Sequence, residues 1–498
     1  MEGAVALSPL STRKKYACAC LVVALACLRL CHLNLLWADE DYHIAAAINI
    51  LHARIPYRDF WYDKPPLCAV YYLLNAGYPG WSLRLLDAGY ILLACWLVYR
   101  LARSWWGDAE GWTAALLFAF FTTFYLPSAV IPFAADALMI VPHLAAIYCA
   151  HKRRSLQAGI WCAVAFLFNT KGVFVLAVCA LWLLPDVLSL LLGFALPVIG
   201  ALLAGWITGA LPGYWQQVWR WSLTYAQQSP VTHPIALGLR RTADWLGFHA
   251  ALVAGAVFAF SRVGRAGRPA QLKELPHNIG ADQWRLVTWL AFSFAAVCLG
   301  TRFAPHYFLQ LLPPMVIIAS RGVVLAWRQY RRIAALILAL LLLVPFIRFG
   351  PRYVTLAIDA IEHRQPQWSD AVLDEDSRAV SEKVRSLAGP GNTLFVWGYR
   401  PDMYVYTRMV SDSVFEDSQP LTGVPADRHL KTDIPIYSAA AAANRLRLAQ
   451  SRPTFIVDGL GLLNPKLAPA VYPELRLWLG HYRLVGRTKL SLIYRWTS

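Results

Sequence analysis

Charged residues of both signs gather in a polar stretch, residues 37–67, directly after the first long apolar run. Three consecutive acids begin at Asp39, and Arg58 and Lys64 follow farther along the stretch. Charged groups beside a bilayer are costly, and those that persist there are usually functional. A carboxylate in such a place can act as a general base, and cations can hold a phosphate leaving group. The stretch therefore predicts transfer of a sugar from a lipid phosphate to an acceptor hydroxyl.

The composition indicates a membrane protein. Hydrophobic residues make up 58% of the 498 positions and charged residues only 15%, with a mean hydropathy of +0.44. A soluble domain carries about 25% charged residues, so the apolar excess must face lipid. The net charge of +17 does not indicate nucleic-acid binding, because the basic residues form short clusters between apolar runs, as in cytoplasmic loops. These clusters lie at 13–15, 100–103, 152–154, 262–268 and 328–332.

Apolar runs of about 20 residues predict membrane spans, and about eleven candidate segments are present. They lie at 16–36, 82–102, 110–126, 132–150, 157–169, 172–185, 187–209, 245–262, 284–300, 306–320 and 333–349. With the N-terminus in the cytoplasm, this odd number places the basic clusters inside and the C-terminal tail outside. We therefore predict a polytopic helical membrane domain over residues 1–349, with its first outer loop at 37–81. Its expected location is the cell inner (plasma) membrane.

The tail, residues 350–498, has a different character. It is charged, lacks a span, and contains short β-type runs at 393–397 and 454–458 and a final hairpin near 485–496. We predict a small extracytoplasmic α/β domain. None of the ten cysteines lies in it, since all occur at or before Cys298, mostly in apolar segments. They are predicted to be small core residues rather than disulfide partners or metal ligands.

The same alternation of spans places other polar residues at outer ends. Asp136 lies near the outer end of the fourth segment, Lys171 in the turn after the fifth, and Arg302 and His306 before the tenth. Residues from distant parts of the sequence thus converge on one membrane face. We therefore predict a single site on the outer side.

Asp39 has two interpretations. Ile44, Ile48 and Leu51 recur at helical spacing, so Asp39 stands at or just before the start of a short amphipathic helix lying on the membrane. Asp is a favoured N-cap residue, and capping alone could explain its presence. The two acids that follow it and the basic segment beyond them favour a catalytic role instead.

These stretches resemble the C-superfamily (GT-C) glycosyltransferases, in the branch of the dolichyl-phosphate-mannose protein mannosyltransferases and the bacterial aminoarabinose transferases. The motifs occur in the order of that family: DEDYH at 39–43, PYRDFWYDKPPL at 56–67, AADALM at 134–139, FLFNTKG at 166–172 and RFAPHYFLQLLPP at 302–314. The resemblance implies a GT-C fold and inverting transfer from a polyprenyl-phosphate-linked sugar to a lipid, glycan or protein acceptor.

Residue by residue, the resemblance implies Asp39 as the catalytic base, Glu40 as its acidic neighbour and Asp136 as the second acidic position. The cations available for the donor phosphate are Lys64, Arg58, Lys171 and Arg302. The residues expected to bind substrate are Tyr42, Tyr57, His306 and Tyr307. One departure is that Asp41 extends the acidic pair to three, so Asp39 and Glu40 could exchange roles.

Other classes of function stay open. A secondary transporter or lipid flippase usually has repeated halves and binding residues near the bilayer midplane, and no repeat is evident. A non-catalytic scaffold would leave the acidic loop unexplained. No cofactor is predicted; three neighbouring acids could bind a divalent cation, but the expected chemistry does not require one.

Overall fold

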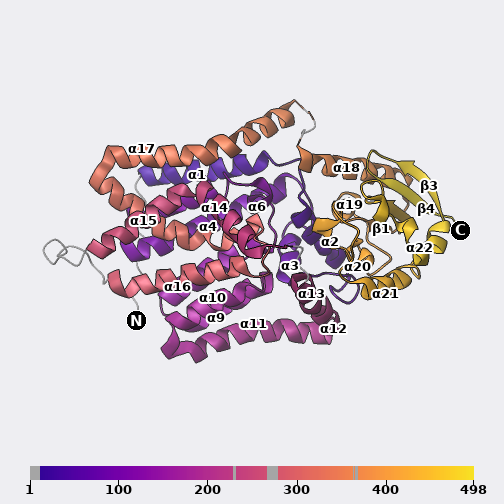
Figure 1. Ribbon diagram of the computed structural model, residues 1–498, viewed down its shortest axis with the longest axis horizontal. Helices are drawn as coiled ribbons and strands as arrows, with labels where there is room; N and C mark the ends of the chain where they lie inside the picture. Colours follow the sequence, from indigo (N-terminus) through magenta and orange to yellow (C-terminus); the bar gives the residue numbers. More distant parts are fainter. Residues whose placement is uncertain (1–11, 228–230, 266–278, 363, 365–367, 498) are drawn as a thin grey trace.

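The computed structural model describes residues 12–227, 231–265, 279–362, 364 and 368–497. Figure 1 shows a bundle of long helices at one end of the molecule and a smaller domain containing the strands at the other. Helices α2 (Ala38–Leu51) and α3 (Leu67–Leu73) lie at the junction. The predicted first outer loop therefore stands where the two parts of the molecule meet.

The helices of the bundle coincide with the apolar segments of the sequence. They are α1 (Thr12–Leu30), α4 (Trp81–Trp106), α5 (Asp108–Phe121), α8 (Ile140–His151), α9 (Ser155–Phe168), α10 (Gly172–Trp182), α11 (Val187–Ile207, after the 3-10 turn η1, Leu184–Asp186), α14 (Pro234–Phe248), α15 (Ala250–Arg265), α16 (Ile279–Cys298) and α17 (Leu312–Ile361). Each predicted segment overlaps one of these helices. Most of α14 lies outside the predicted segments.

Fewer described helices meet the length and apolarity of a membrane span than the hydropathy pattern predicts. Three described helical segments are long and apolar enough to cross a membrane: α4, η1 with α11, and α17. Helices α14 and α15 are apolar and long enough only when taken together, with a bend of 87° between them, as in a broken span or a re-entrant loop. Helices α8, α9 and α10 are apolar but have only 12, 14 and 11 residues, fewer than the roughly 20 that a straight span needs. The structure therefore supports a membrane bundle without confirming eleven spans.

Helix α11 illustrates why lipid must surround the bundle. Only Leu190 and Gly193 of this helix are buried. Leu188, Leu192 and Leu196 are exposed, although their side chains are apolar and contact with water is unfavourable for them. A contiguous apolar surface of this kind is normally covered by a partner or by a membrane. Its length and position in the bundle fit lipid contact.

Helix α17 contains the break that the sequence predicts between two spans. Tyr330, with φ −130° and ψ 37°, leaves helical geometry within the basic cluster at 328–332. The second part of the helix then continues to Ile361. The predicted domain boundary at residue 350 thus lies inside α17, which continues through Gly350 and Pro351.

The C-terminal domain is an α/β domain around one mixed sheet. Its elements are α18 (Ser369–Leu387), β1 (Leu394–Trp397), α19 (Asp402–Thr407), α20 (Gln419–Thr422), η4 (Ala426–Arg428), α21 (Ser438–Leu448), β2 (Phe455–Asp458), η5 (Pro465–Leu467), η6 (Pro469–Val471), α22 (Pro473–Gly480), β3 (Tyr482–Arg487) and β4 (Leu492–Trp496). The strand order is β1-β2-β4-β3, with β1 and β2 parallel and the other pairs antiparallel. Both predicted strands and the final hairpin are confirmed. All residues of β1 and β2 are buried, as expected for continuous apolar runs.

Helix α2 forms where predicted, but it is buried within the protein instead of presenting a polar face to water. Every residue from Glu40 to Asn49 is buried, which an amphipathic surface helix would not show. Asp41 accepts a hydrogen bond from the backbone N–H of Asp402, and the Asn49 amide donates to Glu416. The prediction of a surface helix was wrong because the C-terminal domain covers the polar face.

Several short elements at the same end of the bundle carry the other predicted site residues. They are α6 (Pro127–Val130), α7 (Ala135–Leu138), α12 (Leu211–Tyr214), the π-helical η2 (Trp215–Arg220), α13 (Trp221–Gln227) and η3 (Pro305–Gln310).

Candidate active site

The three acids that open α2 have three different environments. Asp39 is exposed and has no hydrogen bond or ion pair with the described residues, whereas Glu40 and Asp41 are buried. Consecutive residues on a helix point about 100° apart, so the three carboxylates diverge. Among the residues that the structure describes, no three His, Cys, Asp or Glu side chains are arranged to hold a metal ion. The N-cap is Trp37 rather than Asp39, and no side chain caps the helix, so capping does not explain Asp39.

Glu40 is held in a buried ion pair with Arg84 of α4. Its two oxygens accept bonds of 2.8 and 2.9 Å from the guanidinium, which also lies 3.0 Å from Asp87. The same guanidinium donates to the Leu35 carbonyl at 2.7 Å. All three charged side chains are almost fully buried. A carboxylate bound on both oxygens is not free to receive a proton from a substrate.

Sequence reasoning missed Arg84 and Asp87. Both lie inside the predicted span 82–102, and their opposite charges three residues apart are a signal that could have been used. What the sequence could not provide is their partner. Glu40 is 44 positions away, in another helix.

Asp41 faces the C-terminal domain. One of its oxygens accepts from the Asp402 N–H at 3.2 Å, while the other oxygen and one oxygen of Asp402 are buried without a partner among the described residues. Burial and the neighbouring Asp402 raise the pKa of Asp41 well above its usual range. Burial likewise raises the pKa of Asp402 to about 6. Asp41 therefore contributes to the contact between the helical bundle and the C-terminal domain, and it is not exposed as Asp39 is.

Lys64 lies in the loop between α2 and α3. Its Nζ is 3.2 Å from Asp63, and 40% of its side chain is exposed. Partial burial acts to lower the pKa of Lys64, but the Asp63 carboxylate, with a smaller part from Asp39, raises it overall. Lys64 is therefore a cation within the electrostatic reach of Asp39.

Two of the tyrosines expected to bind substrate shape this loop. The Tyr57 hydroxyl donates to the Lys64 carbonyl at 2.8 Å, and the Tyr42 hydroxyl accepts from the Asp63 N–H at 3.1 Å. Both side chains are buried, and Tyr57 has a positive φ of 68°. Their observed contacts position the backbone on either side of Lys64.

Arg58, which was predicted to bind the donor phosphate, contacts protein groups instead. Its guanidinium pairs with Asp59 at 2.7 Å and donates to the Thr208 carbonyl at the end of α11. The structure thus ties Arg58 to α11 and gives it no described contact with Asp39 or Lys64.

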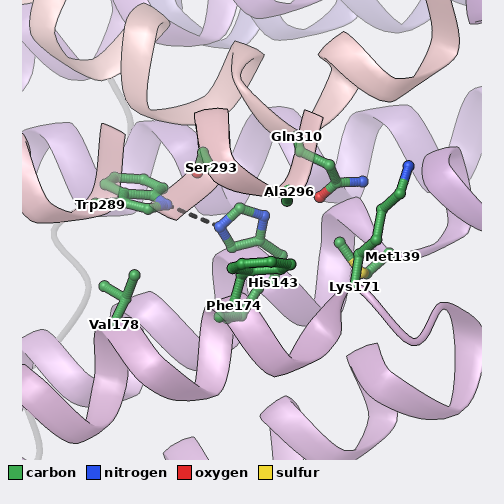
Figure 2. A pocket seen from close by; sticks show the side chains of 10 residues that line it. Met139, His143, Lys171, Phe174, Val178, Trp289, Ser293, Ala296 and Gln310 are labelled. Carbon is green, nitrogen blue, oxygen red and sulfur yellow. Dashed lines mark hydrogen bonds between the residues drawn. The ribbon is translucent and has the colours of Figure 1, made fainter. Parts of the chain in front are cut away.

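A second polar cluster lies between α7, α10 and η3 and brings together Asp136, Lys171 and His306, three of the residues predicted to share one site. Lys171 donates to Asp136 at 3.1 Å and stands over the ring of Tyr307, 3.1 Å from its centroid. His306 lies 3.9 Å from the other Asp136 oxygen, and the Gln310 amide donates to the Asp136 carbonyl. Figure 2 shows Lys171 and Gln310 beside a small cavity that reaches inward to the hydrogen-bonded pair of His143 and Trp289, a bond of 2.8 Å.

The turn that carries Lys171 depends on the glycine that follows it. A Cβ on Gly172 would lie 2.4 Å from the backbone nitrogen of Phe166. Only glycine allows α9 and α10 to approach so closely, and this approach brings Lys171 next to Asp136.

Arg302 joins the bundle to the C-terminal domain. Its guanidinium pairs with Asp427 at 2.9 Å, stacks 3.5 Å from the ring centroid of Tyr225 in α13, and donates to the Tyr225 hydroxyl. Asp427 thus neutralises part of the charge that the sequence assigns to the donor phosphate. The structure groups Arg302 with the domain junction.

An open apolar groove runs beside the Lys64 loop, between α3 and α4. It has a volume of about 560 Å³ and is lined by side chains that include Leu67, Val70, Leu74, Leu85, Leu93 and Phe168. Only Pro65 and Pro66 separate Lys64 from the first residue of the groove. A cation that close in sequence to an apolar groove is a candidate partner for the phosphate head of a molecule whose hydrocarbon tail fills the groove.

The chain resembles solved structures, although the comparisons of its sequence found no match. No family model and no curated protein matches it. The apo structure of ArnT from Cupriavidus metallidurans superposes with a TM-score of 0.60 at 13% identity, covering 97% of this chain and 98% of that one. The ArnT structure bound to undecaprenyl phosphate gives 0.52 at 14% identity over the same shares. ArnT is an aminoarabinose transferase of the GT-C class, and at this identity the likeness shows the fold. The expected resemblance is confirmed at the level of the fold: this chain is an apolar, mostly helical protein that shares the fold of the ArnT structures.

Proposed function

We propose that the protein is a membrane glycosyltransferase that moves a sugar from a polyprenyl-phosphate-linked donor to an acceptor hydroxyl. Asp39 is its general base. The observation that carries the proposal is the exposed carboxylate of Asp39, which has no partner among the described residues and lies within electrostatic reach of Lys64. An apolar groove begins at Leu67, three residues after Lys64. The active side is extracytoplasmic and lies under the C-terminal domain.

The reaction is a single displacement at the anomeric carbon of the sugar. The acceptor oxygen forms a bond to this carbon, and its proton passes to the Asp39 carboxylate. The bond between the anomeric carbon and the phosphate oxygen breaks, and its electron pair stays on the lipid phosphate. A phosphate is a good leaving group, so no paired acid of the glycosidase type is needed. The configuration at the anomeric carbon inverts.

Lys64 holds the phosphate of the donor, and the groove between α3 and α4 holds its hydrocarbon chain. The ammonium has one carboxylate partner and a partly exposed side chain, so it can bind a phosphate oxygen while remaining near Asp63. ArnT, which shares the fold, has been solved with undecaprenyl phosphate bound. A donor of the same lipid class suits this site.

Glu40 and Asp136 are positioning residues in this proposal. Glu40 fixes the first turn of α2 to Arg84, and Asp136 fixes η3 and the Lys171 turn to each other. Lys171 already interacts with Asp136 and Tyr307, and Arg302 with Asp427, so both cations act on the donor at longer range than Lys64.

The test is sugar transfer by the purified full-length protein, supplied with radiolabelled polyprenyl-phospho-sugars and a membrane extract as acceptor. Transfer by the wild type that requires the lipid-linked donor supports the proposal. Movement of a lipid-linked sugar across vesicles, with no transfer from any donor of the class, would favour the flippase alternative and overturn it.

A further inference from the structure

The C-terminal domain brings the side chain of Tyr399 against the first turns of α2. Tyr399 lies in the turn after β1, and its ring stacks on Tyr42 with centroids 5.8 Å apart and planes tilted by 31°. Tyr42 in turn stacks on Tyr62 at 5.3 Å. Tyr399 is therefore the outermost of three packed rings that begin in the Lys64 loop. It is partly exposed, unlike the two rings below it.

The residues on both sides of Tyr399 are firmly anchored. The next residue, Arg400, is buried and pairs with Asp376 at 2.9 Å, and it also donates to Ser491 at 2.8 Å and to the Leu373 carbonyl at 2.7 Å. The preceding Gly398 carbonyl accepts from the Ser418 N–H. A side chain held by such a turn loses little further freedom when it binds a ligand.

The hydroxyl of Tyr399 makes no hydrogen bond within the part of the chain that the structure describes. Tyr42, against which Tyr399 packs, follows Asp39 by three residues and so lies on the same face of α2. Burial raises the pKa of Tyr399 well above its usual range, and the charges of Asp63 and then Asp39 add to this effect. The ring of Tyr399 therefore reaches the face of α2 that carries the free carboxylate of Asp39.

The geometry of the displacement indicates which substrate lies next to Tyr399. In a displacement at one carbon, the attacking and leaving oxygens lie on opposite sides of that carbon. The proposed donor occupies the groove and Lys64, on the side of the bundle. The acceptor must then approach from the side of the C-terminal domain, where Tyr399 stands.

We propose that Tyr399 is an acceptor-positioning residue: its hydroxyl donates a hydrogen bond to the acceptor and directs the attacking oxygen toward Asp39. This inference rests on the proposed function. It makes the C-terminal domain part of the transfer site and gives a role to a domain that the chemistry alone does not require.

The test compares Tyr399→Phe with Tyr472→Phe, which removes a hydroxyl from the same domain but stacks with Trp397 away from α2. Each protein receives the radiolabelled donor and graded amounts of membrane extract. Transfer to the extract and release of free sugar are measured together, because release reports attack by water on the same donor. Binding of undecaprenyl phosphate in nanodiscs is measured in parallel.

We expect Tyr399→Phe to raise the half-saturating amount of extract about tenfold, as for loss of one hydrogen bond. Water attack and undecaprenyl phosphate binding stay unchanged, and so does every property of Tyr472→Phe. An unchanged half-saturating amount, or an equal loss of transfer and water attack, overturns this inference while leaving the transferase intact. Failure of the wild type to transfer or release sugar from any donor counts against the proposed function itself, and against this inference with it.

Discussion

Replacing Asp39 and Glu40 one at a time separates chemistry from structure within one helical turn. Asp39→Asn removes an exposed carboxylate that has no described partner, so the free energy of unfolding should change by less than about 0.5 kcal/mol. Loss of a well-placed general base lowers the rate about 10²–10⁴-fold, which corresponds to roughly 3–5 kcal/mol in the activation barrier. We therefore expect a folded protein with little or no transfer.

Glu40→Gln should instead lower the stability of the protein more than it lowers the rate of transfer. Glu40 receives two bonds from Arg84, at 2.8 and 2.9 Å, in a fully buried place. Breaking a buried ion pair costs about 3–5 kcal/mol. Two features reduce this cost here, because glutamine keeps the shape and one acceptor oxygen of Glu40, and Asp87 still pairs with the Arg84 guanidinium. We expect the lower end, about 3 kcal/mol, and a fall in Tm of roughly 5 °C.

Both variants would be purified in the same detergent and compared for Tm and for initial rate of transfer, with Asp186→Asn as control. Asp186 is also exposed at the start of a helix, at the junction of α10 and α11. Normal turnover by a folded Asp39→Asn protein would refute the assignment of the base. If Glu40→Gln abolished turnover without lowering Tm, the two acids would have exchanged roles.

Three further predictions concern other charged groups of the site and the domain junction. Lys64→Ala should weaken binding of undecaprenyl phosphate in nanodiscs about tenfold or more with Tm unchanged, and Lys64→Arg should restore part of it; equal binding by all three proteins would remove Lys64 from the phosphate site. Asp136→Asn leaves the buried Lys171 without its carboxylate and should cost about 3–5 kcal/mol, while the double variant with Lys171→Met should recover most of the Tm; a double variant no more stable than the single one would contradict this. Burial raises the pKa of Glu416 from its ordinary 4.5 to about 8, although Arg54 partly opposes this, so the folded state keeps a proton that the unfolded chain loses. The associated stability is complete below about pH 4.5 and is lost as the pH rises through about 8. Tm should therefore fall over this range, and Glu416→Gln should flatten the fall; a parallel fall in both proteins would show that another group titrates.

Much of the architecture follows from local patterns. The apolar runs, the break near 328–332 and the strands at 394–397 and 455–458 were predictable, because helix and strand periodicity are recorded over neighbouring residues. The convergence of Asp136, Lys171 and His306 also followed, because alternation of spans places their loops on one side.

The roles within the site were decided only by the tertiary structure. The sequence identified three adjacent acids, but their separate environments come from Arg84 in another helix and Asp402 in another domain. Burial of α2 and the approach of Tyr399 likewise arise from contacts over more than 350 positions, as in the bond between Asp41 and Asp402 with its separation of 361. A single sequence fixes how each segment folds through its own periodicity. Which carboxylate stays free depends on the charges that packing brings against it, and packing is a property of the assembled chain.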